Sequence, residues 1–292
     1  MTSLGAVFRP QLPPERLRDV VEVAEDVGLE ELWLWEDCFR EGGISAAAAS
    51  LGWSERVRVG VGLLPVPLRN VAVTAMEVAA LHRMFPGRAI VGVGHGVQDW
   101  MGQVGARADS PLTLLREHLD ALRALLRGER VTVDGRYVRL DDVALDWPPA
   151  GPVEVLAGAE GPRTLRLSGA AADGTVLTSA TSPDGVRRAL RLIEEGRRAA
   201  GRGADEPHKV VVYLLTATGT DGPARLRAEL VAEGLESVPD LGVAGDADAV
   251  AKAVQRLVEA GADTVILQPT ADEPDPEGFV RFTAEEVRPL VA

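Results

Sequence analysis

Few side chains in this sequence can carry acid–base chemistry, and the candidates stand beside one another or beside glycine. The 292 residues include 4 His, 2 Tyr and 1 Cys. Glu36 and Asp37 are adjacent, and His95 lies between Gly94 and Gly96. Carboxyl and imidazole groups are the usual proton donors and acceptors of enzymes. Asp37, Glu36 and His95 are therefore the candidate catalytic residues.

The adjacency of Glu36 and Asp37 bears on which of them could reach a site. Successive side chains of an extended segment point to opposite faces. We therefore expect one of the two carboxyl groups to face a pocket and the other to face solvent. A salt-bridged pair at the edge of the fold is the competing interpretation.

A second kind of chemistry is suggested by the sequence Gly158-Ala159-Glu160-Gly161-Pro162. It follows an apolar run, and Pro162 is suited to the first position of a helix. Free backbone N–H groups and the helix dipole at such a point favour an anion. The acidic side chain of Glu160 disfavours a phosphate unless it points away. An ordinary turn between a strand and a helix is an equally valid interpretation.

Other chemistries are poorly supported. Cys38 is the sole cysteine, which excludes an intramolecular disulfide and any multi-cysteine metal site. Without a histidine near it in sequence, Cys38 fits a packed side chain better than a nucleophile. No His-x-His pair is present, so we expect no metal site. Neither Lys209 nor Lys252 follows a strand, which disfavours a Schiff-base lyase or sugar-phosphate isomerase.

The elements that must position these residues alternate along the chain. Short, continuously apolar runs, typical of parallel strands covered on both faces, are separated by segments with apolar residues at helical spacing. This alternation favours a (β/α)8 barrel over a doubly wound open sheet, and barrel active sites lie at the carboxyl ends of the strands. The eight runs are Leu4–Phe8, Glu31–Trp35, Val57–Leu64, Arg88–Gly94, Val153–Ala157, Gly174–Ser179, Val210–Thr216 and Asp263–Gln268.

We expect one domain over residues 1–292, because an α/β barrel fills ~250 residues as a single unit. Residues 129–150 are interpreted as an insertion, a hairpin turning at Asp134-Gly135 followed by a proline-rich return. Residues 217–245 form a second, polar and glycine-rich excursion with one helix. Ser110-Pro111, Ser182-Pro183 and Asp246 are expected to begin helices.

The composition of the chain limits the classes of ligand and partner that we expect. Lys and Arg number 31 against 44 Asp and Glu, and the net charge of −13 argues against a nucleic-acid ligand. No apolar run reaches the ~18 residues of a membrane span, and the N-terminus lacks a signal-peptide pattern. We therefore expect a soluble cytoplasmic protein that acts on a small molecule.

Three segments carry a resemblance to a known family: residues Gly60–Gly96, Gly158–Thr178 and Gly261–Phe279. They resemble the bacterial luciferase-like monooxygenase superfamily, especially its branch that uses the deazaflavin coenzyme F420. The resemblance implies a (β/α)8 barrel with an insertion that shields the site, and often a homodimer.

The resemblance also implies how the coenzyme binds. A non-prolyl cis peptide at Gly62-Leu63 would bulge the third strand and back the coenzyme ring, and backbone amides after the fourth and fifth strands would seat its phosphate. Many members end the second strand with Asp-His and an aromatic residue, whereas this chain has Asp37-Cys38-Phe39. The implied coenzyme-binding residues are Cys38, Gly62, Leu63, His95, Gly96, Val97, Gly158, Ala159, Glu160, Gly161 and Ser179.

The leading functional hypothesis is hydride transfer between F420 and a small organic substrate. Asp37 would exchange a proton, with Glu36 and His95 as second candidates. Because a thiol is a poorer base than an imidazole near neutrality, Cys38 in place of the usual histidine means that the resemblance supports coenzyme binding more than alcohol oxidation. The alternatives are an FMN-dependent monooxygenase and a non-catalytic flavin-binding barrel whose pocket is filled by side chains such as Trp35, Trp100 or Leu64.

Overall fold

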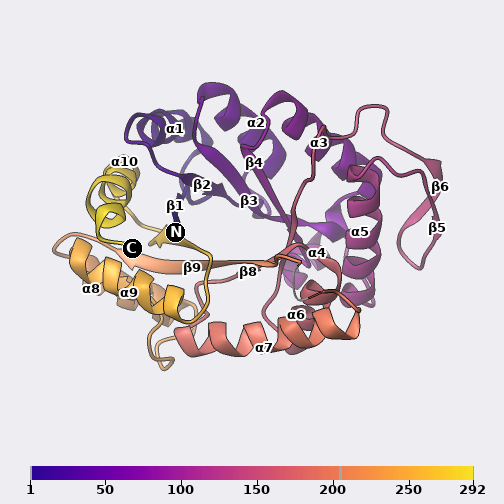
Figure 1. The fold of residues 1–292 in the computed structure, drawn as a ribbon. Helices are drawn as coiled ribbons and strands as arrows, with labels where there is room; N and C mark the ends of the chain where they lie inside the picture. Colours follow the sequence, from indigo (N-terminus) through magenta and orange to yellow (C-terminus); the bar gives the residue numbers. More distant parts are fainter. Residues whose placement is uncertain (1, 204–205, 292) are drawn as a thin grey trace.

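The computed structural model describes residues 2–203 and 206–291. Within these residues, eight parallel strands form a closed barrel, which confirms the predicted fold and excludes the open sheet (Figure 1). The barrel closes because β9 pairs with β8 on one side and with β11 on the other. Its strands are β1 (Ser3–Val7), β2 (Glu31–Leu34), β3 (Arg58–Pro65), β4 (Ala89–Gly94), β7 (Val155–Gly158), β8 (Gly174–Leu177), β9 (Lys209–Ala217) and β11 (Thr264–Pro269).

Helices surround the barrel, as the alternating sequence pattern predicts (Figure 1). Asp246 and Ser182 cap their helices through side-chain oxygens that accept from Ala249 N and Gly185 N, as expected. Ser110 does not: its hydroxyl pairs with Thr113 Oγ1 at 2.8 Å instead. The helices are α1 (Leu17–Asp26), α2 (Gly43–Trp53), α3 (Val71–Met84), α4 (Gln98–Gln103), α5 (Pro111–Leu126), α6 (Pro162–Ala171), α7 (Pro183–Ala199), α8 (Gly222–Ala232), α9 (Ala247–Glu259) and α10 (Pro276–Arg281), with short helical turns at Pro14–Arg16, Val66–Leu68, Phe282–Val287 and Arg288–Leu290.

Apolar side chains form two separate cores. The larger one lies between the strands and the helices, where the helical apolar stripes pack against the outer faces of the strands. The smaller one fills the barrel interior and is centred on Trp33, which is fully buried. A Cβ on Gly60 would lie 2.5 Å from the Trp33 ring, so glycine lets this large side chain fit inside. The interior core thus fills the middle of the barrel and lies beneath the carboxyl ends of the strands.

The predicted hairpin is present as β5 (Val131–Asp134) and β6 (Arg139–Val143), which pair antiparallel. It lies beside α5, at the side of the barrel (Figure 1). The Glu117 carboxylate fixes it there by accepting hydrogen bonds from three successive amides of the hairpin turn, those of residues 136–138.

The second excursion contains α8 and a short strand, β10 (Val243–Ala244), which extends the sheet next to β9. Among the described residues, no helix is both long enough and apolar enough to cross a membrane.

Candidate functional site

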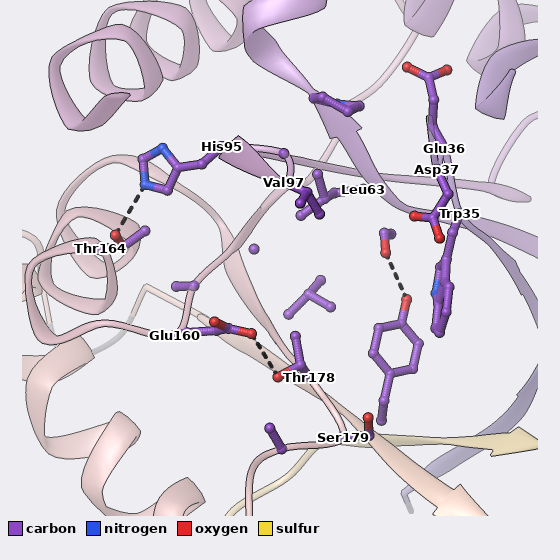
Figure 2. Close-up of a pocket in the computed structure, with 18 of the residues that line it drawn as sticks. Trp35, Glu36, Asp37, Leu63, His95, Val97, Glu160, Thr164, Thr178 and Ser179 are labelled. Atoms are coloured by element: carbon purple, nitrogen blue, oxygen red, sulfur yellow. Dashed lines mark hydrogen bonds between the residues drawn. The ribbon is translucent and has the colours of Figure 1, made fainter. Parts of the chain in front are cut away.

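A pocket of about 660 Å³ opens at the carboxyl ends of the strands, where a barrel places its active site. Figure 2 shows residues that line it. The lining comes from β3, β7, β8, β9 and β11, from the turns after β2, β4, β7 and β8, and from α4, α6 and the end of α8. The lining contains twelve of the thirteen residues that the sequence marked for the site: Glu36, Asp37, Gly62, Leu63, His95, Gly96, Val97, Gly158, Ala159, Glu160, Gly161 and Ser179.

Cys38 is the one marked residue outside this lining. Its side chain is half-buried, and burial together with the nearby Glu36 and Asp37 charges raises the pKa of its thiol. A raised pKa keeps the sulfur protonated near neutrality, the opposite of an activated thiolate. The structure thus does not place Cys38 against the cavity.

Glu36 and Asp37 point in different directions, as their adjacency predicts (Figure 2). The expectation that the second carboxyl group faces solvent is wrong, because the Glu36 side chain is only 12% exposed and is salt-bridged to Arg69. The Glu36 carboxylate accepts hydrogen bonds from Arg69 Nε at 2.9 Å, Arg69 Nη2 at 2.6 Å and Gly43 N at 2.7 Å. These charge-assisted hydrogen bonds fix the position of the carboxylate and turn it toward Arg69 and Gly43. Glu36 thus joins the end of β2 to α2 and to the turn before α3.

Asp37 turns its carboxylate toward the Trp35 side chain and the cavity (Figure 2). Burial raises the pKa of Asp37, and the positive charges of Arg40 and Arg9 offset part of that effect. Among the described residues, no side chain forms an ion pair with it. Of the two adjacent carboxyl groups, Asp37 is the one available to a ligand.

His95 lies on the opposite side of the pocket, where its Nε2 is 3.1 Å from the Thr164 hydroxyl. Burial lowers the pKa of its imidazole, and the backbone of Pro111 offsets part of this effect. His95 is therefore neutral near pH 7 and can offer hydrogen bonds rather than positive charge.

Backbone amides after β4 and β7 converge on this same side. The amides of Gly96, Val97, Glu160 and Gly161 have no hydrogen-bond partner within residues 2–203 and 206–291. Gly96 adopts a φ of +64°, a conformation that favours glycine. Ala159 differs from the expectation, because its amide already donates to the Val176 carbonyl at 3.1 Å. The Ala159 amide is therefore not available to an anion, whereas the amides of Gly96, Val97, Glu160 and Gly161 are.

The acidic side chain of Glu160 would disfavour an anion at these amides unless it pointed away from them. Its carboxylate accepts a hydrogen bond from Thr178 Oγ1 at 3.0 Å (Figure 2). This bond turns the Glu160 carboxylate toward Thr178, which directly follows β8, and away from His95. The Glu160 amide stays available while its carboxylate is held elsewhere.

A hydrophobic wall lies between the anion seat and Asp37, and Leu63 is its centre. The Gly62–Leu63 peptide is cis, as predicted, and the β3–β4 register shifts between Val61 and Leu64. The Leu63 side chain packs over Gly94 and Gly158, where any Cβ would overlap it. A second non-prolyl cis peptide, Cys38–Phe39, was not predicted.

Several residues that line the pocket were not predicted from the sequence. Tyr213 stands on β9, and its hydroxyl donates to the Gly62 carbonyl at 3.2 Å. Thr164 and Glu233 contribute from α6 and from the end of α8. Tyr213 could have been singled out as one of only two tyrosines, in mid-strand, whereas nothing local marks Glu233.

The lining also bears on two expectations about the pocket. Trp35 and Trp100 line the cavity but do not fill it, and Leu64 is fully buried away from it. A barrel filled by these side chains is therefore not what the structure presents. No residue of the 131–143 hairpin lines the pocket, because the hairpin is fixed to α5. Trp100 of α4 and Glu233, just after α8, line the pocket instead.

Comparison with known proteins gives a consistent picture. Residues 3–239 match the luciferase-like monooxygenase family. A 5,10-methylenetetrahydromethanopterin reductase from Methanolobus tindarius is 30% identical over 204 residues, 70% of this chain and 62% of that protein. An F420-dependent glucose-6-phosphate dehydrogenase from Nakamurella multipartita is 33% identical over 67% of this chain, again 62% of that protein. The chain thus aligns with less than two thirds of these two curated relatives.

Other matches extend over whole chains. The Methanopyrus kandleri methylenetetrahydromethanopterin reductase is 26% identical over 98% of both proteins. Among solved structures, an F420-dependent secondary alcohol dehydrogenase with an F420-acetone adduct has a TM-score of 0.88 at 22% identity over 100% of this chain and 99% of the other. A type II Baeyer-Villiger monooxygenase from Pseudomonas putida in complex with FMN has a TM-score of 0.78 at 17% identity over 100% and 99%. The chain belongs to the luciferase-like monooxygenase family.

Proposed function

We propose that this protein binds coenzyme F420 in the barrel pocket and catalyses hydride transfer between it and a small organic substrate. One observation carries the proposal: the unpaired amides after β4 and β7, the Leu63 wall and the unpaired Asp37 carboxylate line one cavity. The relatives named for F420 support the choice of coenzyme.

The residues present fit such a coenzyme. A phosphate needs hydrogen-bond donors, and the amides of Gly96, Val97, Glu160 and Gly161 supply them, with Thr164 beside them. A planar ring needs an apolar surface, which Leu63 and its neighbours provide. The cavity volume falls in the range of ordinary cofactor sites. When bound, the deazaflavin supplies the hydride chemistry.

The protein's own residues then hold and protonate the substrate. Asp37 faces the cavity and would accept a proton from a substrate hydroxyl, or return one to a carbonyl oxygen. Its burial raises the pKa toward the range where a carboxyl group exchanges protons efficiently. Glu36 acts at a distance, because its bonds to Arg69 and Gly43 keep the end of β2 in place.

The test is turnover. The protein is incubated with oxidised F420 and a panel of small alcohols, or with reduced F420 and the matching carbonyl compounds, while coenzyme fluorescence is recorded. We expect substrate-dependent reduction or oxidation of F420. A parallel assay uses reduced FMN and oxygen. Oxygen-dependent product from FMN, with no change in F420 for any substrate, would overturn the proposal in favour of a monooxygenase.

A further inference from the structure

We propose that this pocket selects a neutral or positively charged organic substrate and rejects compounds that carry a phosphate or carboxylate group. The inference rests on the proposed function for the identity of the coenzyme, while the charge of the cavity follows from the lining alone. It concerns the part of the pocket beside Asp37, where the substrate would lie.

The lining is rich in unpaired negative charge. Asp37, Glu160 and Glu233 all line the cavity, and in the part of the chain that the structure describes none of them forms an ion pair. Glu36 also lines it, but Arg69 neutralises this carboxylate at 2.6 Å. Asp37 is half-buried, whereas Glu160 and Glu233 are exposed at the mouth and are more strongly screened by solvent. Asp37 therefore carries most of the expected effect.

Matching positive charge is missing from the lining. Among residues 2–203 and 206–291, no Lys or Arg lines the pocket. The Arg9 guanidinium lies 5.0 Å from the Trp35 ring centroid, but only 5% of Arg9 is exposed. Its Nη1 donates to Glu229 at 2.8 Å and to the Pro269 carbonyl at 3.0 Å. This guanidinium is therefore already occupied.

Arg40 is the remaining cation near Asp37. It is exposed, donates to the Pro10 carbonyl at 3.0 Å and does not line the cavity. Its charge lowers the pKa of Asp37, yet burial outweighs that effect and leaves the pKa raised. Glu233 is exposed overall, but partial burial of its carboxyl group and the charge of Glu229 raise its pKa as well. A negative charge is thus already unfavourable at both positions, and a second anion beside them adds repulsion.

The coenzyme does not relieve this repulsion. Figure 2 places His95 and Thr164 on one side of the pocket and Asp37 with Trp35 on the other. The unpaired amides lie on the His95 side, so an anionic coenzyme group would use them there. An anionic substrate beside Asp37 would then lie next to a carboxylate, with no Lys or Arg side chain in the lining to offset its charge. Charge repulsion of this kind is a usual source of specificity.

The experiment uses three probes of similar size: benzyl alcohol, benzylammonium and benzoate. Their binding is measured by calorimetry on the protein saturated with F420 and on the protein in excess inorganic phosphate, so that benzoate does not occupy the free amides. We expect benzoate to bind at least ~10-fold more weakly than benzyl alcohol, and benzylammonium to bind at least as well as the alcohol. The F420-saturated protein should discriminate at least as strongly.

Variants assign the effect to the lining. Asp37→Asn combined with Glu233→Gln should bring benzoate to within ~3-fold of benzyl alcohol. Glu233→Gln alone should produce a smaller shift in the same direction. Glu22→Gln, on the exposed face of α1, removes the same charge away from the pocket and should change nothing. Circular dichroism confirms that each variant is folded.

The outcomes separate this inference from the proposed function. Benzoate binding as tightly as benzyl alcohol, failure of all three probes to bind, or an unchanged ratio in the folded double variant would overturn it. If F420 fails to bind while the probes keep the expected order, the proposed function fails and the charge selectivity stands.

Discussion

At the scale of single residues, Asp37 is the carboxyl group that faces the cavity without a partner. Asp37→Asn should lower turnover by about 10²-fold or more, because the amide cannot accept the proton. F420 affinity should stay nearly unchanged, since the amide seat lies on the other side of the pocket. Steady-state turnover and coenzyme titration of the same sample check both parts.

Cys38→Ser is the neighbouring control for Asp37→Asn and should be mild, because the thiol lies outside the lining. Full activity of Asp37→Asn would remove Asp37 as the proton-transfer group. Abolished activity of Cys38→Ser would show that the thiol takes part after all.

Glu36 has a structural role in this account, so its substitution should act on stability. Glu36→Gln removes the anion that Arg69 contacts, and both side chains are largely buried, with 12% and 16% exposed. Arg69 keeps its second partner, Glu77, 2.6 Å from Nη1, so losing the Glu36 charge should lower the free energy of unfolding by about 1–2 kcal/mol. The exposed Arg18–Glu22 pair offers the control: Glu22→Gln should change stability by less than about 0.5 kcal/mol. Urea unfolding gives both free energies of unfolding, and equal losses in the two variants would contradict this role.

Glu41 introduces a pH dependence. Both of its carboxyl oxygens are buried without a hydrogen-bond partner among the described residues, and burial together with Asp37 raises its pKa to about 7. Because the folded pKa lies above the ordinary value of 4.5, the folded state binds the proton more tightly. The stabilisation is full below about 4.5 and is lost as the pH rises through about 7.

Glu41→Gln removes this titration. At a pH below about 4.5 the variant should be as stable as the wild type. At about pH 8 it should be more stable by roughly 2 kcal/mol. Urea unfolding across this pH range measures the difference. Parallel pH profiles for the two proteins would show that Glu41 is not the group responsible.

At the scale of elements, the contact between α6 and α7 depends on two glycines. A Cβ on Gly169 would overlap the Ile193 carbonyl, and a Cβ on Gly196 would overlap the Arg166 carbonyl. Backbone atoms cannot move aside as a side-chain tip can, so the helices would have to separate. Gly169→Ala should therefore lower the free energy of unfolding by about 2 kcal/mol or more.

Gly52 provides the matched control for that substitution. It lies on α2 with nothing within 4 Å of its ideal Cβ. Gly52→Ala should stabilise the protein by roughly 0.5–1 kcal/mol, because alanine loses less backbone freedom on folding. Thermal unfolding of both variants gives the comparison, and a stabilised Gly169→Ala protein would refute close packing at this contact.

Elements with a local signal were predicted well. All eight apolar runs overlap strands of the barrel, and the Asp134-Gly135 turn lies in the observed hairpin. Contacts between elements that are far apart in the sequence were not predicted. The hairpin is held against α5 by Glu117, and the Glu36–Arg69 pair joins residues 33 positions apart. A local pattern contains no information about such partners.

At the scale of the whole molecule, the pocket exists because the barrel closes. Tyr213 of β9 meets Gly62 of β3 across the barrel, 151 positions apart in sequence. The sequence could mark Gly62 and Asp37 through the family resemblance and the strand-end rule. It could not mark Glu233, because only the closed barrel brings the end of α8 to the cavity.

The central claim is that this barrel pocket is built for coenzyme F420. Equilibrium titration of the protein with F420 and FMN side by side, followed by coenzyme fluorescence, tests it most directly. We predict saturable binding of F420 at one site, at least ~10-fold tighter than FMN. Tighter binding of FMN, or saturation by neither coenzyme, would contradict the claim.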